Sequence, residues 1–96
     1  MIAVVILNWN GAEMLRRFLP SVVEHSQPLG EVIVADNGST DESLEVLQQE
    51  FPEVRNLVLD RNYGFAEGYN EAFRRLEEVA PQRYEYYLLL NSDVRV

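Results

Sequence analysis

Short apolar runs alternate with helical patterns along the whole chain, and this alternation limits the folds open to it. Residues 2–7 form a continuous apolar run rich in β-branched side chains, which is typical of a parallel strand covered on both faces. An apolar stripe with helical spacing follows and predicts a helix over residues 12–26. Pro20 lies within this stripe, so we expect a kink or a restarted turn near Leu19.

The remaining sequence repeats the same alternation. Residues 31–35 predict a second strand, and Ser39 with Glu42 matches a capping box that opens a helix reaching about Phe51. Residues 54–59 predict a third strand and residues 86–90 a fourth. Between these two strands, the buried side of a third helix is marked by Phe65, Tyr69, Ala72, Phe73 and Leu76.

Four strands that alternate with three helices predict an α/β fold with a largely parallel sheet and right-handed crossovers. We expect a three-layer, Rossmann-like arrangement, with residues 1–96 forming one domain. The sequence contains no internal repeat, low-complexity tract or linker.

The composition excludes several classes of function. The chain has eight basic residues, all of them arginine, against sixteen acidic ones, and a net charge of -8. Such a chain is unsuited to nonspecific binding of nucleic acid or anionic lipid. It has no cysteine, hence neither a disulfide nor a thiolate zinc site, and no segment long and apolar enough to cross a membrane. These features fit a protein of the cytoplasm.

Polar clusters follow each predicted strand. The clusters are Asn8 with Asn10, residues 36–40, residues 61–64 and residues 91–93. Ligands of open α/β sheets bind beyond the carboxyl ends of the strands, so we expect the four clusters to share one site.

The chemistry of these clusters differs from two common nucleotide sites. The glycine spacing of a dinucleotide fold is missing, and a chain without lysine has no Walker lysine. Asp36 suits an N–H donor on an uncharged base edge, such as that of uracil or thymine. Asp93 suits a divalent cation that bridges a diphosphate.

Each of these residues also has a simpler interpretation. Asp36 in "DNGS" is good turn chemistry, and Ser39, Thr40 and Asp41 are typical helix caps. Arg61 and Asp93 fit solvated surface positions as well. Three further sets are interpreted structurally: Gly64 and Gly68 as turn and packing glycines, His25 as a partner of a helix dipole, and Trp9 and tyrosines 84, 86 and 87 as packing groups.

Four segments together carry a family resemblance. The segments "VVILNWNG", "VIVADNGSTDES", "RNYGFAEGYNEA" and "YYLLLNSDV" resemble, in order and spacing, the N-terminal half of a family 2 glycosyltransferase with the GT-A fold, close to the rhamnosyltransferase-like branch. The resemblance covers almost the whole chain. It implies inverting transfer of a sugar from a UDP- or dTDP-sugar donor to a saccharide or lipid-linked acceptor, as in the synthesis of cell-wall or other polysaccharides, usually with Mg²⁺ or Mn²⁺.

The resemblance also assigns roles to residues. It implies that Asp36 binds the pyrimidine base, that Asn8 lies beside the uridine-like moiety, that Arg61 and Asn62 lie near the nucleotide, and that Asp93 binds the metal. The full set of expected donor-binding residues is Asn8, Asn10, Asp36, Asn37, Arg61, Asn62, Gly64, Asn91 and Asp93.

The sequence departs from the family pattern in two places. Asn91 replaces the first acid of the D-x-D motif, which weakens the expected metal affinity. The chain ends three residues after Asp93, and no residue matches the family's general base. We therefore expect a donor-binding fragment that lacks the acceptor-binding half, is inactive alone, and in the full-length protein lies in the cytoplasm or at the cytoplasmic face of the membrane.

Two other functions remain as alternatives, an inactive folding unit and a receiver-like interaction module. The second needs an acidic cluster after the first strand and a lysine, and the sequence has neither. The family's strand order, 3-2-1-4, leaves the fourth strand as an apolar edge. Such an edge pairs readily with another chain, so we expect a homodimer.

Overall fold

The computed structural model describes residues 2–26, 30–79, 83–84 and 86–91. Their elements follow the predicted alternation of strands and helices. In chain order they are β1 (Ile2–Asn8), α1 (Ala12–Ser26), β2 (Gly30–Asp36), α2 (Ser43–Glu50), β3 (Arg55–Val58), α3 (Phe65–Val79) and β4 (Tyr86–Asn91).

The four strands form one parallel sheet in the order β3-β2-β1-β4, which confirms the expected order. The register pairs Asn8 with Asp36 and Leu7 with Asn91. Asp36 in turn pairs with Val58, near the end of β3. The carboxyl ends of all four strands therefore meet at one edge of the sheet.

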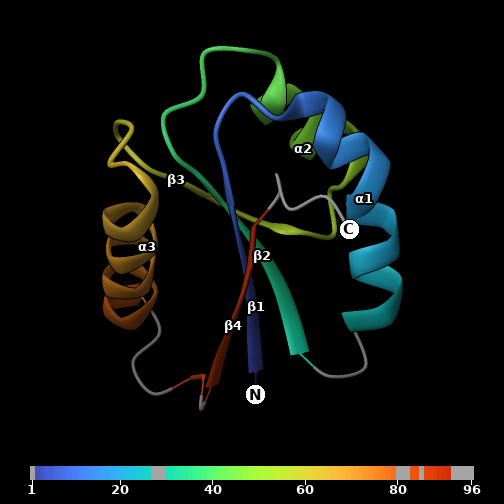
Figure 1. Cartoon of the computed structure of the whole chain (residues 1–96). Coiled ribbons are helices and arrows are strands. Elements are labelled where there is room, and N and C mark those ends of the chain that lie inside the picture. The colour runs from blue at the N-terminus through green and yellow to red at the C-terminus, as the bar shows by residue number, and fades with distance from the viewer. Residues whose placement is uncertain (1, 27–29, 80–82, 85, 92–96) are drawn as a thin grey trace.

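The sheet lies between two helical layers, as Figure 1 shows, with α1 and α2 on one face and α3 on the other. Alternate residues of β1 face the two layers: Val4 and Ile6 pack toward α1 and α2, whereas Ala3 and Val5 pack toward α3. A strand whose side chains are buried on both faces has to be apolar throughout, and this explains the unbroken apolar run of residues 2–7. The three-layer α/β fold is confirmed.

Helix α1 runs through Pro20 without a break, so the predicted restart near Leu19 is not found. Leu19 is fully buried, and Val22 and Val23 after the proline pack against the same core. This packing holds the helix together on both sides of Pro20, although the proline has no N–H to donate. None of the helices among the described residues is long and apolar enough to cross a membrane.

Helix α2 begins at Ser43, and the capping box predicted from Ser39 and Glu42 is wrong. Glu42 makes no side-chain capping hydrogen bond. Asp41 serves instead: its Oδ1 accepts the Ser43 N–H at 2.9 Å, and its Oδ2 accepts the Ala12 N–H at 3.3 Å. One carboxylate thus satisfies backbone donors at the start of two helices, α1 and α2.

Candidate functional site

The carboxyl edge of the sheet brings together most of the residues that the sequence predicted for a site. The loops after β1, β2 and β3 carry Asn10, Asn37 and the segment 61–64, and the strand ends carry Asn8 and Asp36. For Asn91 the structure describes only the backbone, which pairs with β1 at this edge. Asp93 lies outside the described residues.

Asp36 ends β2 as a buried carboxyl group that is 1% exposed. Its Oδ1 accepts hydrogen bonds from Asn8 Nδ2 at 3.0 Å and from Ser39 Oγ at 2.7 Å, and its Oδ2 accepts the Ser39 N–H at 3.0 Å. These donors offset the cost of burying the group. The turn that "DNGS" predicts is therefore formed, and among the described residues Oδ2 accepts one hydrogen bond where Oδ1 accepts two.

Asn8, at the end of β1, is fully buried and holds Asp36 in place. Its Nδ2 donates to Asp36 and also to Ser39 Oγ at 3.3 Å, whereas its Oδ1 is buried without a hydrogen-bond partner. A Cβ at Gly11 would lie 2.6 Å from this Oδ1, so only glycine leaves room for it. The conformation of Asn8 thus depends on the glycine of "NWNG".

Asn10 links the loop after β1 to the loop after β2. Its Oδ1 accepts the backbone N–H groups of Thr40 at 2.7 Å and Asp41 at 3.2 Å, and its own N–H donates to Ser39 Oγ at 2.9 Å. Its φ of 49° lies in the left-handed region, which asparagine tolerates better than most residues. Its side chain therefore orders the second loop.

Asn37 links β2 to the loop after β3, residues 59–64, which we call the β3–α3 loop. Asn37 Oδ1 accepts the Tyr63 N–H at 2.9 Å, and Nδ2 donates to Gly64 O at 3.0 Å and to Asn62 Oδ1 at 3.2 Å. Gly38, with φ 76°, packs so closely that a Cβ there would lie 2.6 Å from the backbone of Arg61 and Asn62. The two loops are therefore in direct contact.

Arg61 lies exposed in the β3–α3 loop. Its guanidinium carbon is 4.6 Å from the centre of the Tyr63 ring, within the range of a cation–π contact. Among the described residues no carboxylate lies within salt-bridge distance of Arg61. Its positive charge is therefore available to an anionic ligand.

The two glycines of this region have different structural roles. Gly64 has φ 80° and open space around it, and it forms the turn into α3. A Cβ at Gly68 would lie 2.9 Å from Leu7 and 3.0 Å from Asn37 Nδ2, so this glycine lets α3 approach the sheet closely. Both match the predicted turn and packing glycines.

Two aromatic residues interpreted as packing groups are exposed instead. Trp9 is 55% exposed in the loop after β1, and Tyr86 is 68% exposed on the edge strand β4. Tyr84 is buried and Tyr87 partly buried, as expected. Trp9 follows the last strand residue directly, and the change from a strand to a left-handed turn at Asn10 leaves its side chain outside the core. His25 lies in the last turn of α1, where it accompanies the helix dipole as predicted.

Sequence reasoning missed the contacts by which Ser39, Tyr63 and Arg75 order the site. Ser39, interpreted as a cap, contacts Asn8, Asn10 and Asp36. Tyr63 supports Arg61, and a helical arginine, Arg75, contacts the same loop. For Ser39, the "NGST" segment after a strand was a usable signal, whereas no local pattern points to Arg75.

The expected metal ligand, Asp93, lies outside the described residues. Within the described residues, no group of three or more acidic, histidine or cysteine side chains gathers to hold a metal. Asp93 and Asn91 would supply one carboxylate and one amide oxygen, and such oxygen ligands suit Mg²⁺ or Mn²⁺.

Ligands of open parallel α/β sheets bind beyond the carboxyl ends of the strands. At this edge the described residues place a buried carboxyl group, that of Asp36, and an arginine without an acidic partner among them, Arg61. Comparison with known proteins makes the class specific. The chain belongs to glycosyl transferase family 2, whose sequence pattern matches residues 3–95.

Two curated relatives are similar to this chain. An N-acetylglucosaminyl-diphospho-decaprenol L-rhamnosyltransferase of Mycobacterium tuberculosis (strain CDC 1551 / Oshkosh) is 31% identical over 97 residues, covering 96% of this chain and 32% of the relative. An uncharacterized glycosyltransferase of Nostoc sp. is 33% identical over 75 residues, covering 75% of this chain and 23% of the relative. The chain thus spans about a third or less of the length of these relatives.

Solved structures share the fold. Staphylococcus aureus TarS 1-349 in complex with UDP-GlcNAc matches with a TM-score of 0.73 at 23% identity, over 96% of this chain and 26% of that one. The mannosyltransferase PcManGT from Pyrobaculum calidifontis, in complex with GDP-Man and Mn²⁺, matches with a TM-score of 0.62 at 22% identity, over 77% of this chain and 24% of that one. The resemblance to family 2 glycosyltransferases with the GT-A fold is confirmed.

Proposed function

We propose that this chain is the donor-binding part of an inverting glycosyltransferase that uses a nucleoside diphosphate sugar. The observation that carries the proposal is that Asp36 and Arg61, which has no acidic partner among the described residues, lie at one edge of the sheet. One ligand, a nucleoside diphosphate, carries both complementary groups: an N–H donor on its base for Asp36 and a negatively charged diphosphate for Arg61. The fold neighbours solved with UDP-GlcNAc and GDP-Man support the same class of ligand.

In this proposal the residues at the edge divide into two groups. Asp36 accepts an N–H of a uracil or thymine base through its less occupied Oδ2, and Arg61 with Asn62 faces the diphosphate, whose negative charge the guanidinium attracts when the donor binds. Asn8 and Asn37 are buried and bonded to the protein, so they act by holding Asp36 and the β3–α3 loop. Asn10 and Gly64 shape the loops that border the donor.

Asp36 is almost fully covered by its own turn, which has a consequence for binding. A base reaches Oδ2 only after the segment around Ser39 shifts, because Ser39 N–H and Oγ both contact this carboxyl group. We therefore expect donor binding to change the environment of Ser39.

We propose that Asp93, assisted by Asn91, holds Mg²⁺ or Mn²⁺ in the full-length protein. A neighbour solved with Mn²⁺ supports this choice of ion. The metal would supply positive charge to the diphosphate. With an amide in place of the first acid, we expect weaker metal binding than a D-x-D pair gives.

We further propose that the acceptor-binding half and the general base lie in sequence of the full-length protein that these 96 residues do not include. The share of its relatives that the chain covers, 32% of the rhamnosyltransferase, supports this division. That relative is named for a diphospho-decaprenol acceptor, so we propose a saccharide or lipid-linked acceptor and a position in the cytoplasm or at the cytoplasmic face of the membrane.

Calorimetry on the full-length protein tests the proposal. We expect UDP or dTDP to bind in the presence of Mn²⁺, and the variants Asp36→Asn and Arg61→Ala each to weaken binding by about tenfold or more, since each removes a charged partner of the ligand. Arg17→Ala, on the exposed face of α1, is the matched control for Arg61. The proposal fails if neither nucleotide binds, and the pyrimidine assignment fails if GDP or ADP binds more tightly than both.

We also propose that the chain forms a homodimer through β4. Among the described strands β4 pairs with β1 alone, which leaves its other side open, and Tyr86, Leu88 and Leu89 are exposed large apolar residues. An apolar edge of this kind pairs with a second chain. Light scattering on the 96-residue chain should give a dimer that Leu88→Lys converts to a monomer; a monomer at high concentration without any substitution contradicts the proposal.

A further inference from the structure

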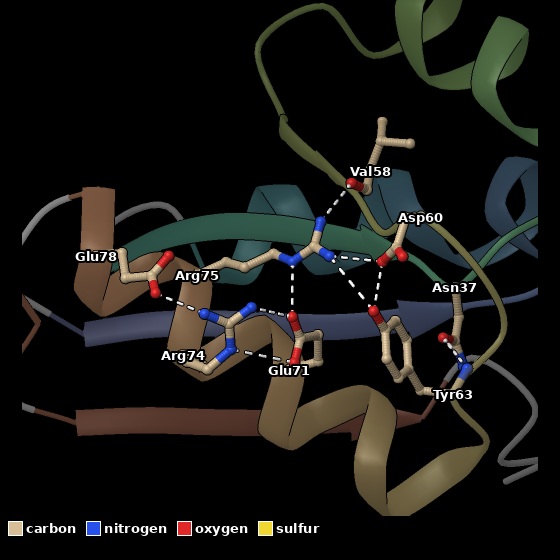
Figure 2. A network of polar contacts seen from close by, with 8 residues as sticks. All are labelled: Asn37, Val58, Asp60, Tyr63, Glu71, Arg74, Arg75 and Glu78. Atoms are coloured by element: carbon tan, nitrogen blue, oxygen red, sulfur yellow. Dashed lines mark hydrogen bonds and ion pairs between the residues drawn. The ribbon is translucent and has the colours of Figure 1, made fainter.

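A second set of contacts holds the β3–α3 loop from the side opposite Asn37, and it comes from α3. Figure 2 shows the guanidinium of Arg75 directed from this helix toward Val58, at the end of β3, and toward Asp60 and Tyr63 in the β3–α3 loop. Arg75 Nη1 donates to Val58 O at 3.3 Å, and Nη2 donates to Asp60 Oδ1 at 2.6 Å and to Tyr63 Oη at 3.5 Å. One side chain thus spans the loop that carries Arg61.

The contacts continue from Arg75 to the ligand-facing arginine. Tyr63 Oη donates to the same Asp60 Oδ1 that Arg75 contacts, and the ring of Tyr63 lies under the guanidinium of Arg61. The hydrogen bond from Tyr63, followed by the contacts with Arg75, lowers the pKa of Asp60, so this carboxylate stays charged at neutral pH. Arg75, Asp60 and Tyr63 therefore form a continuous support beneath Arg61.

Arg75 is itself held in a defined orientation. Glu71, one turn earlier on α3, accepts a hydrogen bond from Arg75 Nε at 3.0 Å. Hydrogen bonds from Arg74 and then Arg75 lower the pKa of Glu71 to about 2. All three nitrogens of the Arg75 guanidinium have partners, and the planar group can bridge separate acceptors in a way that a lysine cannot.

The neighbouring Arg74 provides an internal comparison. It shares Glu71 as a partner, but its other ion pair is with Glu78, so among the described residues its hydrogen bonds and ion pairs stay on α3. Its side chain is 55% exposed, whereas that of Arg75 is 25% exposed. The two arginines carry the same charge and lie on the same helix. In the described part of the chain, Arg75 donates hydrogen bonds to the β3–α3 loop and Arg74 does not.

We propose that Arg75 is a positioning residue for the donor site, which orders the β3–α3 loop and holds Arg61 on Tyr63 before the diphosphate arrives. This inference rests on the proposed function, in which Arg61 faces the diphosphate. Ordering a loop when a ligand binds costs conformational entropy, so a loop that is ordered in advance binds its ligand more tightly. Loss of the support that Arg75, Asp60 and Tyr63 form should therefore weaken donor binding and leave the chemical step unchanged.

The test compares Arg75→Met with Arg74→Met in the full-length protein, because methionine keeps most of the apolar stem and removes the charge. We expect Arg75→Met to raise the donor KM by about tenfold with kcat within about twofold, and Arg74→Met to change neither by more than about twofold. Arg75→Lys should recover only part of the loss, because a lysine ammonium reaches Glu71 or Asp60 but does not bridge the two carboxylates as the guanidinium does.

A second readout does not need a donor. Hydrogen exchange of residues 59–64 should become faster in Arg75→Met and stay unchanged in Arg74→Met, with circular dichroism confirming that both variants fold. If wild-type protein binds neither UDP nor dTDP, the proposed function fails, whereas this exchange comparison still decides whether Arg75 orders the loop. Unchanged exchange in Arg75→Met overturns the inference.

A double variant examines whether Arg75 and Asp60 act as one unit. We expect Asp60→Asn to raise the donor KM, as Arg75→Met does. The donor KM of the double variant, which combines both substitutions, should lie within about twofold of the KM of the single variant with the larger effect. If the two changes in KM multiply in the double variant, or if Arg74→Met and Arg75→Met change KM equally, then Arg75 and Asp60 do not hold the loop as one unit.

Discussion

The two ends of the sheet hold their polar groups in different ways. At the carboxyl end, Asp36 is buried and bonded to neutral donors, and Arg61 is left without an acidic partner among the described residues. At the amino end, Glu31 accepts Tyr84 Oη at 2.7 Å and pairs with both Arg55 and Arg83. Charges that neutralise one another hold the fold, whereas charges left apart are available to a ligand.

The two ends of the sheet also differ in which segments carry their polar groups. The amino-end cluster joins β2, β3 and the segment before β4, and it is closed by the partners it already has. The carboxyl end is a set of three loops that hold one another through amide side chains, those of Asn10 and Asn37 above all. Asparagine supplies donors and acceptors without adding charge, so the network orders the loops and leaves the charge of Arg61 free.

The largest expected difference comes from removing one carboxyl group at each end. Asp36→Ala should lower the free energy of unfolding by about 3 kcal/mol, because it leaves the buried amide donor of Asn8 and the half-buried donors of Ser39 without their acceptor. Glu31→Ala removes a partly exposed group with as many partners and should cost about 1 kcal/mol. Urea denaturation of both variants measures the difference, and equal costs would contradict the contrast between the two ends.

The two glycines with positive φ at the carboxyl end provide the next comparison. Gly38→Ala should cost about 2 kcal/mol and displace the β3–α3 loop, because strain at φ 76° adds to a backbone clash. Gly64→Ala has the same kind of strain but open space, and should cost about 1 kcal/mol. Thermal unfolding and nucleotide titration of the full-length variants measure both, and weaker nucleotide binding only in Gly64→Ala would show that the contact at Gly38 is unimportant.

A smaller effect is expected at Asp41, the carboxylate that caps two helices. Partial burial raises the pKa of Asp41, but hydrogen bonds from Ser43 and Ala12 outweigh this and lower it. A lowered folded pKa gives stability that is present above the unfolded pKa of about 4 and is lost as the pH falls through the folded value. Asp41→Asn should therefore cost about 1 kcal/mol at pH 7 and less in acid.

Glu42→Gln is the matched control for Asp41, because Glu42 precedes the same helix and makes no side-chain capping bond. We expect it to change stability by less than about 0.5 kcal/mol. Urea denaturation at neutral and acidic pH compares the two variants, and a loss at Asp41 that does not depend on pH would contradict the capping role of its carboxylate.

The smallest effect is expected at the amino end, where Tyr84 contacts Glu31. Tyr84→Phe should cost about 0.5 to 1 kcal/mol and leave nucleotide binding unchanged. Burial, followed by the hydrogen bond to Glu31, raises the pKa of Tyr84. The stability that this group contributes is therefore complete below the ordinary tyrosine pKa of about 10 and is lost as the pH rises through the folded value.

Alkaline unfolding followed by circular dichroism measures this loss. Tyr84→Phe should lose less stability than wild type above a pH of about 10, and Tyr86→Phe, on an exposed side chain, should behave as wild type does. An identical alkaline response in all three proteins would remove Tyr84 from the amino-end network.

The helices and strands, their order along the chain and the edge of the sheet at which the polar residues meet could all be predicted from the sequence. These follow from local patterns: apolar runs mark strands buried on both faces, helical periodicity marks the covering layers, and parallel strands bring their carboxyl ends together. Asn8, Asp36 and Arg61 were predicted at this edge because each directly follows or ends a strand pattern, and the family resemblance added their roles.

Which polar groups bond to one another depends instead on how the elements pack in the folded protein. Ser39 contacts Asn8 rather than capping a helix, Trp9 lies outside the core, α1 continues through Pro20, and Arg75 reaches back from α3 to Asp60. Each depends on distances between residues far apart in the chain, and a hydrogen bond is decided within a few tenths of an ångström. Local patterns specify which residues are buried and in which element, but the orientation of a side chain follows from the packing of all the elements around it.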